Sequence, residues 1–199
     1  MILNYDDSLK DTSFYSFAKK IISSICFFLF RPRFIGLENV PETGGVVLAG
    51  NHTSNFDWML HIMAIKRHVH FLGKIELFKG HFSWLMRNMG VIPVNRSVHD
   101  KQAMRTAVKG LIQGKCIVVF PEGTINRTDD TIMPFKFGAV RMASIAGVPV
   151  VPFTIKGKFR LFGKRPILSF YPAIFPHGED LTDYNNELME TVKVNLETE

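Results

Sequence analysis

The chain has 199 residues, of which 46% are hydrophobic and 21% charged, a composition typical of one globular domain with a substantial core. The formal net charge of +6 and the pI near 9.4 favour a polyanionic partner: a nucleic acid, an anionic membrane or a phosphorylated substrate. Eighteen Phe against four Tyr and two Trp, with a mean hydropathy of +0.09, favour the membrane. The sequence has no zinc-finger spacing, basic-region heptads or RNA-binding aromatic motif, so we expect no nucleic-acid partner.

The N-terminal residues and the two cysteines indicate an intracellular protein. Cys26 and Cys116 are far apart, each in an apolar run, so neither a disulfide framework nor a cysteine metal cluster is expected. Asn4, Asp6 and Asp7 near the start argue against a secretory signal peptide. We therefore expect a reducing cytoplasm.

A helical pattern extends from Thr12 to Phe30 and ends at Arg31-Pro32-Arg33. Its apolar side would carry Phe14, Phe17, Ala18, Ile21, Ile25 and Phe28, and its polar side Ser16, Lys19, Lys20, Ser23 and Ser24. The uninterrupted apolar run is shorter than the roughly 18 to 20 residues that cross a bilayer, and the lysines would lie at mid-depth. We interpret residues 1–33 as an N-terminal amphipathic, membrane-interacting helix. An ordinary helix packed on the domain and a true span are the alternatives.

Residues 34–199 alternate short apolar runs with longer helical stretches. Strands are predicted at 46–50, 69–73, 91–94, 116–120 and 148–155, and helices near 55–66, 81–89, 99–113 and 135–146. This alternation predicts a single α/β domain with a largely parallel sheet flanked by helices. Residues 167–171 are predicted to add an edge strand, and residues 182–196 a closing helix.

A histidine and a carboxylate lie five positions apart in Asn51-His52-Thr53-Ser54-Asn55-Phe56-Asp57, directly after the first predicted strand. A carboxylate bonded to one ring nitrogen holds a histidine in a single tautomer, as a general base requires, although a plain helix N-terminal turn has the same spacing. Ligands collect at the carboxyl ends of parallel strands. Phe120-Pro121-Glu122-Gly123-Thr124, which follows another strand, is therefore expected to face the same crevice, with an ordinary strand-to-loop turn as the alternative.

Four blocks, in order, resemble those of the glycerolipid acyltransferases. Asn51 to Asp57 resembles their H-x4-D motif, and Phe120 to Thr124 their F-P-E-G-T block. Lys74-Ile75-Glu76-Leu77 followed by Gly90 to Arg96 is similar to the block that ends in a phosphate-reading arginine, and Val148 to Pro152 is similar to the last block. The resemblance spans Gly36 to about Gly157, and the bacterial 1-acyl-sn-glycerol-3-phosphate acyltransferases are the closest subgroup.

The resemblance implies acyl transfer from acyl-CoA or an acyl carrier protein to the sn-2 hydroxyl of lysophosphatidate, at the cytoplasmic side of an anionic membrane, with no cofactor and no metal. His52 would be the general base and Asp57 would orient it. Arg96 would bind the phosphate of the acceptor, because a guanidinium grips two oxygens, with Lys74 as a second charge. The remaining residues implied to hold glycerol phosphate are Glu122, Gly123 and Thr124.

Two basic residues rank lower. Arg127 departs from the family pattern because Ile125 and Asn126 separate it from Thr124, and Lys136 is as readily explained as an ordinary residue at a helix start. The alternatives to the main hypothesis are another lysophospholipid or glycerol 3-phosphate as acceptor, a thioesterase, and a non-catalytic lipid-binding membrane adaptor. The other histidines, including the pair in His68-x-His70, are expected to be packed or solvent-facing rather than metal ligands.

Overall fold

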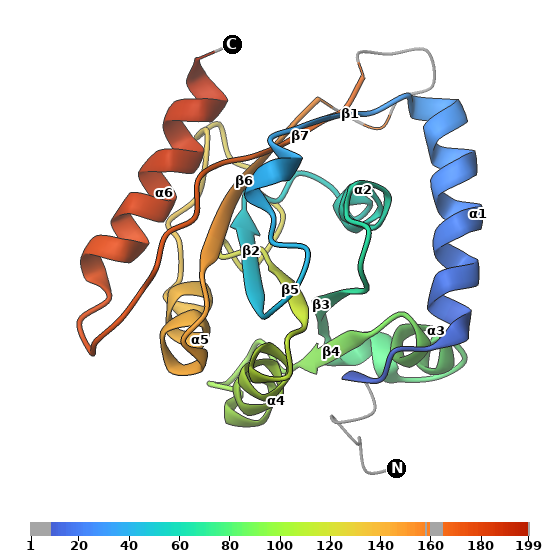
Figure 1. The fold of residues 1–199 in the computed structure, drawn as a ribbon, viewed down its shortest axis with the longest axis horizontal. Helices are drawn as coiled ribbons and strands as arrows, with labels where there is room; N and C mark the ends of the chain where they lie inside the picture. The colour runs from blue at the N-terminus through green and yellow to red at the C-terminus, as the bar shows by residue number, and fades with distance from the viewer. Residues whose placement is uncertain (1–8, 158, 160–164, 199) are drawn as a thin grey trace.

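A seven-stranded sheet forms the centre of the computed structural model, which describes residues 9–157, 159 and 165–198 (Figure 1). In spatial order the strands are β1 (Arg33–Ile35), β7 (Ile167–Phe170), β6 (Val150–Lys156), β2 (Val46–Gly50), β5 (Cys116–Val119), β3 (Val69–Lys74) and β4 (Val91–Val94). All neighbours are parallel except β6 and β7. The predicted α/β architecture is confirmed. Asn4, Asp6 and Asp7 lie outside the described residues.

Helices cover both faces of the sheet, as the apolar strand sequences require. In β2, Val47 and Ala49 belong to the core under α4 (Lys101–Ile112), α5 (Gly138–Ala146) and α6 (Thr182–Glu197). Val46 and Leu48 belong to the core on the other face, with residues of α1 (Ser13–Phe30) and α2 (Asp57–Ala64). A strand buried on both sides has no polar face to alternate with its apolar one, so β2 reads as a continuous apolar run.

The remaining helical segments are η2 (Leu37–Asn39), η3 (Ile75–Phe78) and α3 (Phe82–Asn88). The predicted helices are present, and α6 starts at Thr182 as predicted, whereas α2 starts at Asp57, α4 at Lys101 and α5 at Gly138, each later than predicted. The strand predicted from residue 148 starts at Val150, because Val148 still donates its backbone N–H to the carbonyl of Ala143 in the cap of α5, in which Gly147 has the left-handed φ of 65° that terminates many helices.

Residues 167–170 form a strand, β7, but the prediction that it lies at the edge of the sheet is wrong. β1 pairs in parallel with β7 and is itself the edge, so β7 lies between β1 and β6. Nothing in the hydrophobic pattern indicates β1, which has three residues and exposes both Arg33 and Ile35. Arg33, the last residue assigned to the N-terminal helical segment, is therefore part of the sheet.

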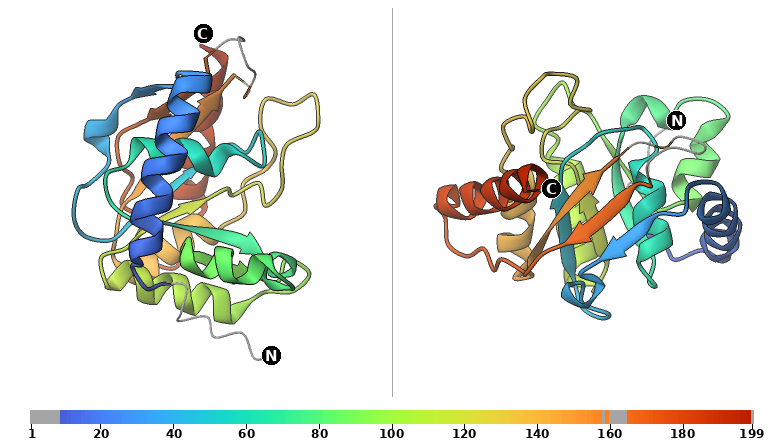
Figure 2. Two further views of the ribbon diagram at one scale, coloured as in Figure 1. Left: turned by 90° about the vertical axis from the view of Figure 1, so that its right-hand side faces the viewer. Right: turned by 90° about the horizontal axis from the view of Figure 1, so that it is seen from above.

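The helix α1 is the outermost one on its side and packs on α2 (Figure 2). Its apolar residues do not share one side as predicted, because Phe14 and Ala18 pack against the core. The others are exposed, among them Phe17 at 62% and Phe28 at 82%. Lys19, from the predicted polar side, turns inward and donates hydrogen bonds to the backbone carbonyls of residues 65 and 66.

By length and composition, α1 qualifies as a membrane-crossing helix, with a mean hydropathy of 1.3 over its 18 residues. Among the helices in the described part of the chain, α1 alone meets this test. The core helix of a soluble protein or a signal sequence can meet the same test. Of the residues of this helix, 11% are buried in the protein, namely Tyr15 and Cys26.

Gly50, the last residue of β2, leaves no room for a side chain. A Cβ at this position would lie 2.1 Å from the carbonyl oxygen of Phe153 in the neighbouring β6. Because that oxygen is a backbone atom, relief requires the two strands to separate. We expect Gly50→Ala to lower the free energy of unfolding by about 3 kcal/mol or more, measured by urea denaturation. Gly138→Ala, where nothing lies within 4 Å, is the control, and equal stability of the two variants would contradict the prediction.

Candidate active site

His52 and Asp57 form the hydrogen-bonded pair that their spacing predicts. Nδ1 of His52 lies 2.8 Å from Oδ2 of Asp57, where the loop after β2 enters α2. The same Oδ2 accepts hydrogen bonds from the backbone N–H groups of Thr53 at 2.7 Å and Ser54 at 2.9 Å. Because an ionised carboxylate only accepts, it fixes the proton of His52 on Nδ1. The other ring nitrogen, Nε2, keeps the lone pair that a general base needs.

Asn51 and Phe120 help to hold His52 in place, and the sequence analysis assigned neither of them a role. The Asn51 side chain pairs with the backbone of Ile155 in β6, donating to its carbonyl at 3.0 Å and accepting from its N–H at 2.7 Å. The Phe120 ring stacks on the imidazole, with centroids 4.0 Å apart and planes 16° from parallel. Their adjacency to His52 and Glu122 in the chain is the signal that would have found them.

The Glu122 carboxylate bonds to two separate loops. Oε1 accepts from the backbone N–H of His52 at 2.7 Å, and Oε2 from the backbone N–H of Met133 at 3.0 Å. The residue is only 2% exposed. Burial raises the pKa of Glu122, while the two backbone hydrogen bonds act in the opposite direction. The carboxylate thus fastens the turn after β5 to the backbone of His52, and its predicted contact with glycerol phosphate stays a prediction.

A cavity of about 720 Å³ lies beside Phe120 and contains basic residues. Arg96 lines it and donates from Nη1 to the Gly123 carbonyl at 2.7 Å. Lys136 also lines it, and its Nζ lies so close to Gly123 that a Cβ there would approach within 2.7 Å. Arg141, which the sequence analysis did not single out, is a third cation on its wall. The apolar part of the wall includes Leu72, Val94, Ala103, Met104, Val119 and Met142.

Cations and apolar side chains in one cavity suit a ligand with an anionic head and a hydrocarbon part. The size of the cavity is in the range of ordinary ligand sites. His52, Asp57 and Glu122 are not among the described residues that line the cavity. Phe120 connects the two places, because it lines the cavity and its ring stacks on the imidazole of His52.

The structure does not bring Lys74, Thr124 and Arg127 into the wall of this cavity as far as the described residues go. Lys74 is the exposed last residue of β3, and the other two are exposed on the loop after β5. That loop is tied to the site through Asn126, whose N–H donates to the His52 carbonyl at 3.0 Å. Their predicted roles in substrate binding stay predictions.

Comparisons with known proteins show which family this chain is similar to. A family described as Acyltransferase matches residues 31–156. A 1-acyl-sn-glycerol-3-phosphate acyltransferase of Borreliella burgdorferi is 34% identical over 164 residues, or 81% of this chain and 65% of the relative. Its counterpart in Bacillus subtilis is 28% identical over 171 residues, or 78% and 83% of the two chains.

The chloroplastic 1-acyl-sn-glycerol-3-phosphate acyltransferase BAT2 of Brassica napus is 33% identical over 149 residues, which cover 72% of this chain and 43% of the relative. The chain therefore spans less than two thirds of the length of some relatives that it matches. Among solved structures, the 1-acyl-sn-glycerophosphate (LPA) acyltransferase PlsC of Thermotoga maritima has a TM-score of 0.73 at 25% identity. The match covers 92% of this chain and 80% of that one.

Replacing Glu122 by glutamine tests what its carboxylate does. The amide keeps one acceptor oxygen but turns an NH2 group toward one of the two backbone N–H donors, which then loses its bond. We expect Glu122→Gln to lower the free energy of unfolding by about 1–3 kcal/mol, the usual cost of an unsatisfied buried polar group, measured by urea denaturation. Glu187→Gln, at an exposed position of α6, is the control. Equal stability of the two variants would show that the carboxylate does not hold the loops together.

Proposed function

Since this chain belongs to the acyltransferase family, we propose that it transfers an acyl group from a thioester to the sn-2 hydroxyl of 1-acylglycerol 3-phosphate and so forms phosphatidate. The names of its relatives in B. burgdorferi and B. subtilis support this acceptor. The observation that carries the proposal is the 2.8 Å contact between His52 Nδ1 and Asp57 Oδ2. It leaves Nε2 as the proton acceptor, and the Phe120 ring that stacks on the imidazole also lines a cavity with basic residues.

In the proposed reaction, Nε2 of His52 takes the proton of the acceptor hydroxyl while its oxygen attacks the thioester carbonyl. The C–S bond then breaks, and the leaving thiolate receives the proton. Asp57 stabilises the imidazolium that exists between these steps, as the acid of a catalytic triad does. The hydroxyl of the acceptor is itself the nucleophile, so no acyl-enzyme intermediate is needed.

Arg96 and Lys136 are the proposed ligands of the acceptor phosphate. Both line the cavity beside Phe120 and both lie against Gly123, so two cations converge on one turn. A guanidinium binds two phosphate oxygens at once, and an ammonium adds a point charge. Lys74 and Thr124 are proposed to assist from the rim. Either acyl-CoA or an acyl carrier protein would serve as the donor.

We also infer that α1 attaches the protein to the cytoplasmic surface of an anionic membrane. Phe17, Ile21, Ile25 and Phe28 expose apolar surface in one helix, which favours insertion at the interface. The net charge of +6 adds attraction to anionic lipids. The acceptor is a lipid, so this attachment brings the enzyme to the phase in which its substrate resides.

His52→Gln should abolish most of the acyl transfer. Glutamine preserves much of the size of the side chain but cannot accept a proton, and general-base catalysis contributes about 10²–10⁴-fold to rate. We expect kcat/KM to fall by that factor when lysophosphatidate and a labelled acyl thioester are assayed for diacyl product. His177→Gln, at an exposed histidine, should keep full activity. A fully active His52→Gln protein would refute the mechanism, and free fatty acid as the main wild-type product would indicate a thioesterase.

Arg96→Ala should raise KM for a phosphate-bearing acceptor. A hydrogen bond to a charged group contributes about 1.5–3 kcal/mol, so we expect an increase in KM of about 10- to 100-fold. With an uncharged monoacylglycerol the same variant should differ little from wild type. Arg105→Ala, at an exposed arginine of α4 outside the cavity wall, is the control. An unchanged KM for lysophosphatidate in Arg96→Ala would remove the role assigned to this arginine.

A further inference from the structure

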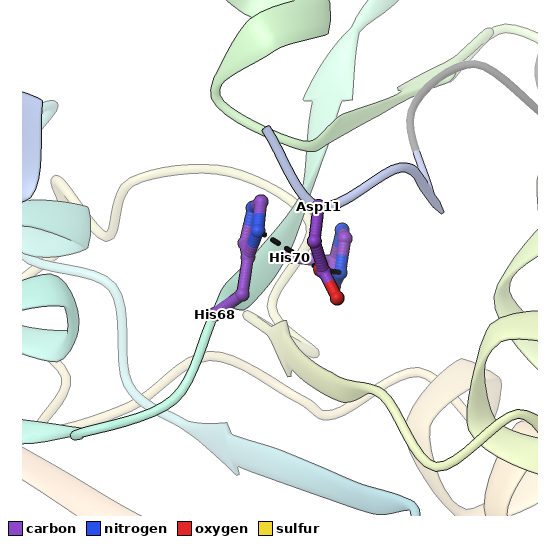
Figure 3. Close-up of side chains that lie close together, drawn as sticks. All are labelled: Asp11, His68 and His70. Carbon is purple, nitrogen blue, oxygen red and sulfur yellow. Dashed lines mark ion pairs between the residues drawn. The ribbon is translucent and has the colours of Figure 1, made fainter. Parts of the chain in front are cut away.

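A cluster of three potential metal ligands lies at the end of the sheet away from the candidate active site (Figure 3). His68 immediately precedes β3 and His70 lies within it, while Asp11 comes from the segment before α1. β2 and β3 both run parallel to β5. The two histidines therefore lie near the start of the strands, whereas His52 follows the end of β2.

The donor atoms of the cluster are close together. Oδ1 of Asp11 lies 3.1 Å from Nδ1 of His68 and 3.9 Å from Nε2 of His70, and all three ligand atoms lie within 4.8 Å of one another. The His68 side chain is 10% exposed and that of His70 is fully buried, whereas Asp11 is open to solvent. The cluster thus combines two largely buried rings, on β3 and directly before it, with one accessible carboxylate.

Each ring presents one nitrogen to Asp11, Nδ1 from His68 and Nε2 from His70. Nδ1 of His70 donates to the carbonyl oxygen of Gly90 at 3.1 Å, which holds the orientation of this ring. A second partner on the other ring nitrogen is a regular feature of histidines that bind metals. Because an ionised carboxylate only accepts, the His68 nitrogen that faces Asp11 carries a proton in the metal-free protein, and a metal ion would displace that proton.

Lys115 shares the carboxylate of Asp11 with the two rings. Lys115 Nζ lies 2.6 Å from Oδ2 of Asp11, which leaves Oδ1 to face the two rings.

From this geometry we propose that Asp11, His68 and His70 bind one divalent transition-metal ion of the zinc class. Two imidazole nitrogens, one carboxylate oxygen and a water make a tetrahedral set that Zn²⁺ accepts. With metal–ligand bonds of about 2.0–2.1 Å, tetrahedral ligands lie roughly 3.4 Å apart, close to the two contacts of Asp11. The rings stack at 4.4 Å and 5°, so binding requires them to turn toward a common point.

The site departs from the expectation, based on sequence, that these histidines are only packed or solvent-facing. Its consequence would be mechanical, because the ion would tie the segment that precedes α1 to β3. Thr12, the next residue, caps α1 with its side chain and donates to the Asn88 carbonyl. The proposed ion would therefore fix the N-terminal end of the helix that we assign to the membrane.

The test uses the full chain without a histidine tag, stripped of metal by a chelator. Zn²⁺ binding is measured by calorimetry, and Co²⁺ binding by its visible absorption as a probe of nitrogen and oxygen ligands. We expect one equivalent to bind and the midpoint of thermal unfolding to rise with Zn²⁺. Asp11→Asn and His68→Asn should each weaken binding by at least about 100-fold, because loss of a second-shell partner alone costs 10- to 100-fold, and should remove the thermal shift.

Asp11 is exposed, so Asp11→Asn separates loss of binding from loss of folding, which circular dichroism checks. His177→Asn should bind like wild type. The proposal is overturned if the wild-type protein binds no saturating equivalent, if Asp11→Asn and His68→Asn bind as wild type does, or if His177→Asn lowers binding as much as they do. Acyl transfer by Asp11→Asn tests the proposed function separately, since this residue lies outside the catalytic machinery.

Discussion

The carboxylate of Asp57 is fully buried, and the geometry of the loop that carries His52 depends on how this charge is satisfied. It accepts hydrogen bonds from the ring of His52, from the backbone N–H groups of Thr53 and Ser54, and from the Thr53 hydroxyl. A buried charge without such partners costs several kcal/mol or more. Its place at the first residue of α2 adds the favourable field of a helix N-terminus. The bonds that stabilise this charge are therefore the bonds that shape the loop and orient the base.

A second buried carboxylate, that of Glu122, complements the first. Asp57 holds the side chain of His52, whereas Glu122 holds its backbone N–H. The two charges repel each other, since Asp57 contributes to the raised pKa of Glu122. Placing both at the carboxyl ends of neighbouring strands is electrostatically expensive, and proteins concentrate such arrangements at functional sites. The backbone donors of His52 and Met133 offset this cost.

Much of the fold could be predicted because the strands buried on both faces, such as β2, read as continuous apolar runs. The pairing of His52 with Asp57 was also accessible, since both residues belong to one loop. The orientation of Glu122 was not, because its partners are backbone N–H groups, which every residue except proline has and which no pattern marks. The same holds for Asp11 and His68, which only the folded chain brings together. Local spacing thus predicts contacts within a loop, and long-range contacts need the three-dimensional structure.

The C-terminal end of α1 connects the proposed membrane attachment with the loop that carries His52. At its C-terminal end, the Phe30 ring lies 5.2 Å from that of Phe159, which lies 6.2 Å from that of Phe56 in the catalytic loop. Phe56 is 53% exposed, so the apolar surface of the helix continues into the loop that holds His52. A bilayer that received α1 at its interface would therefore also meet this loop. A lysophospholipid leaving that bilayer would then reach the imidazole without exposing its acyl chain to water over a long path.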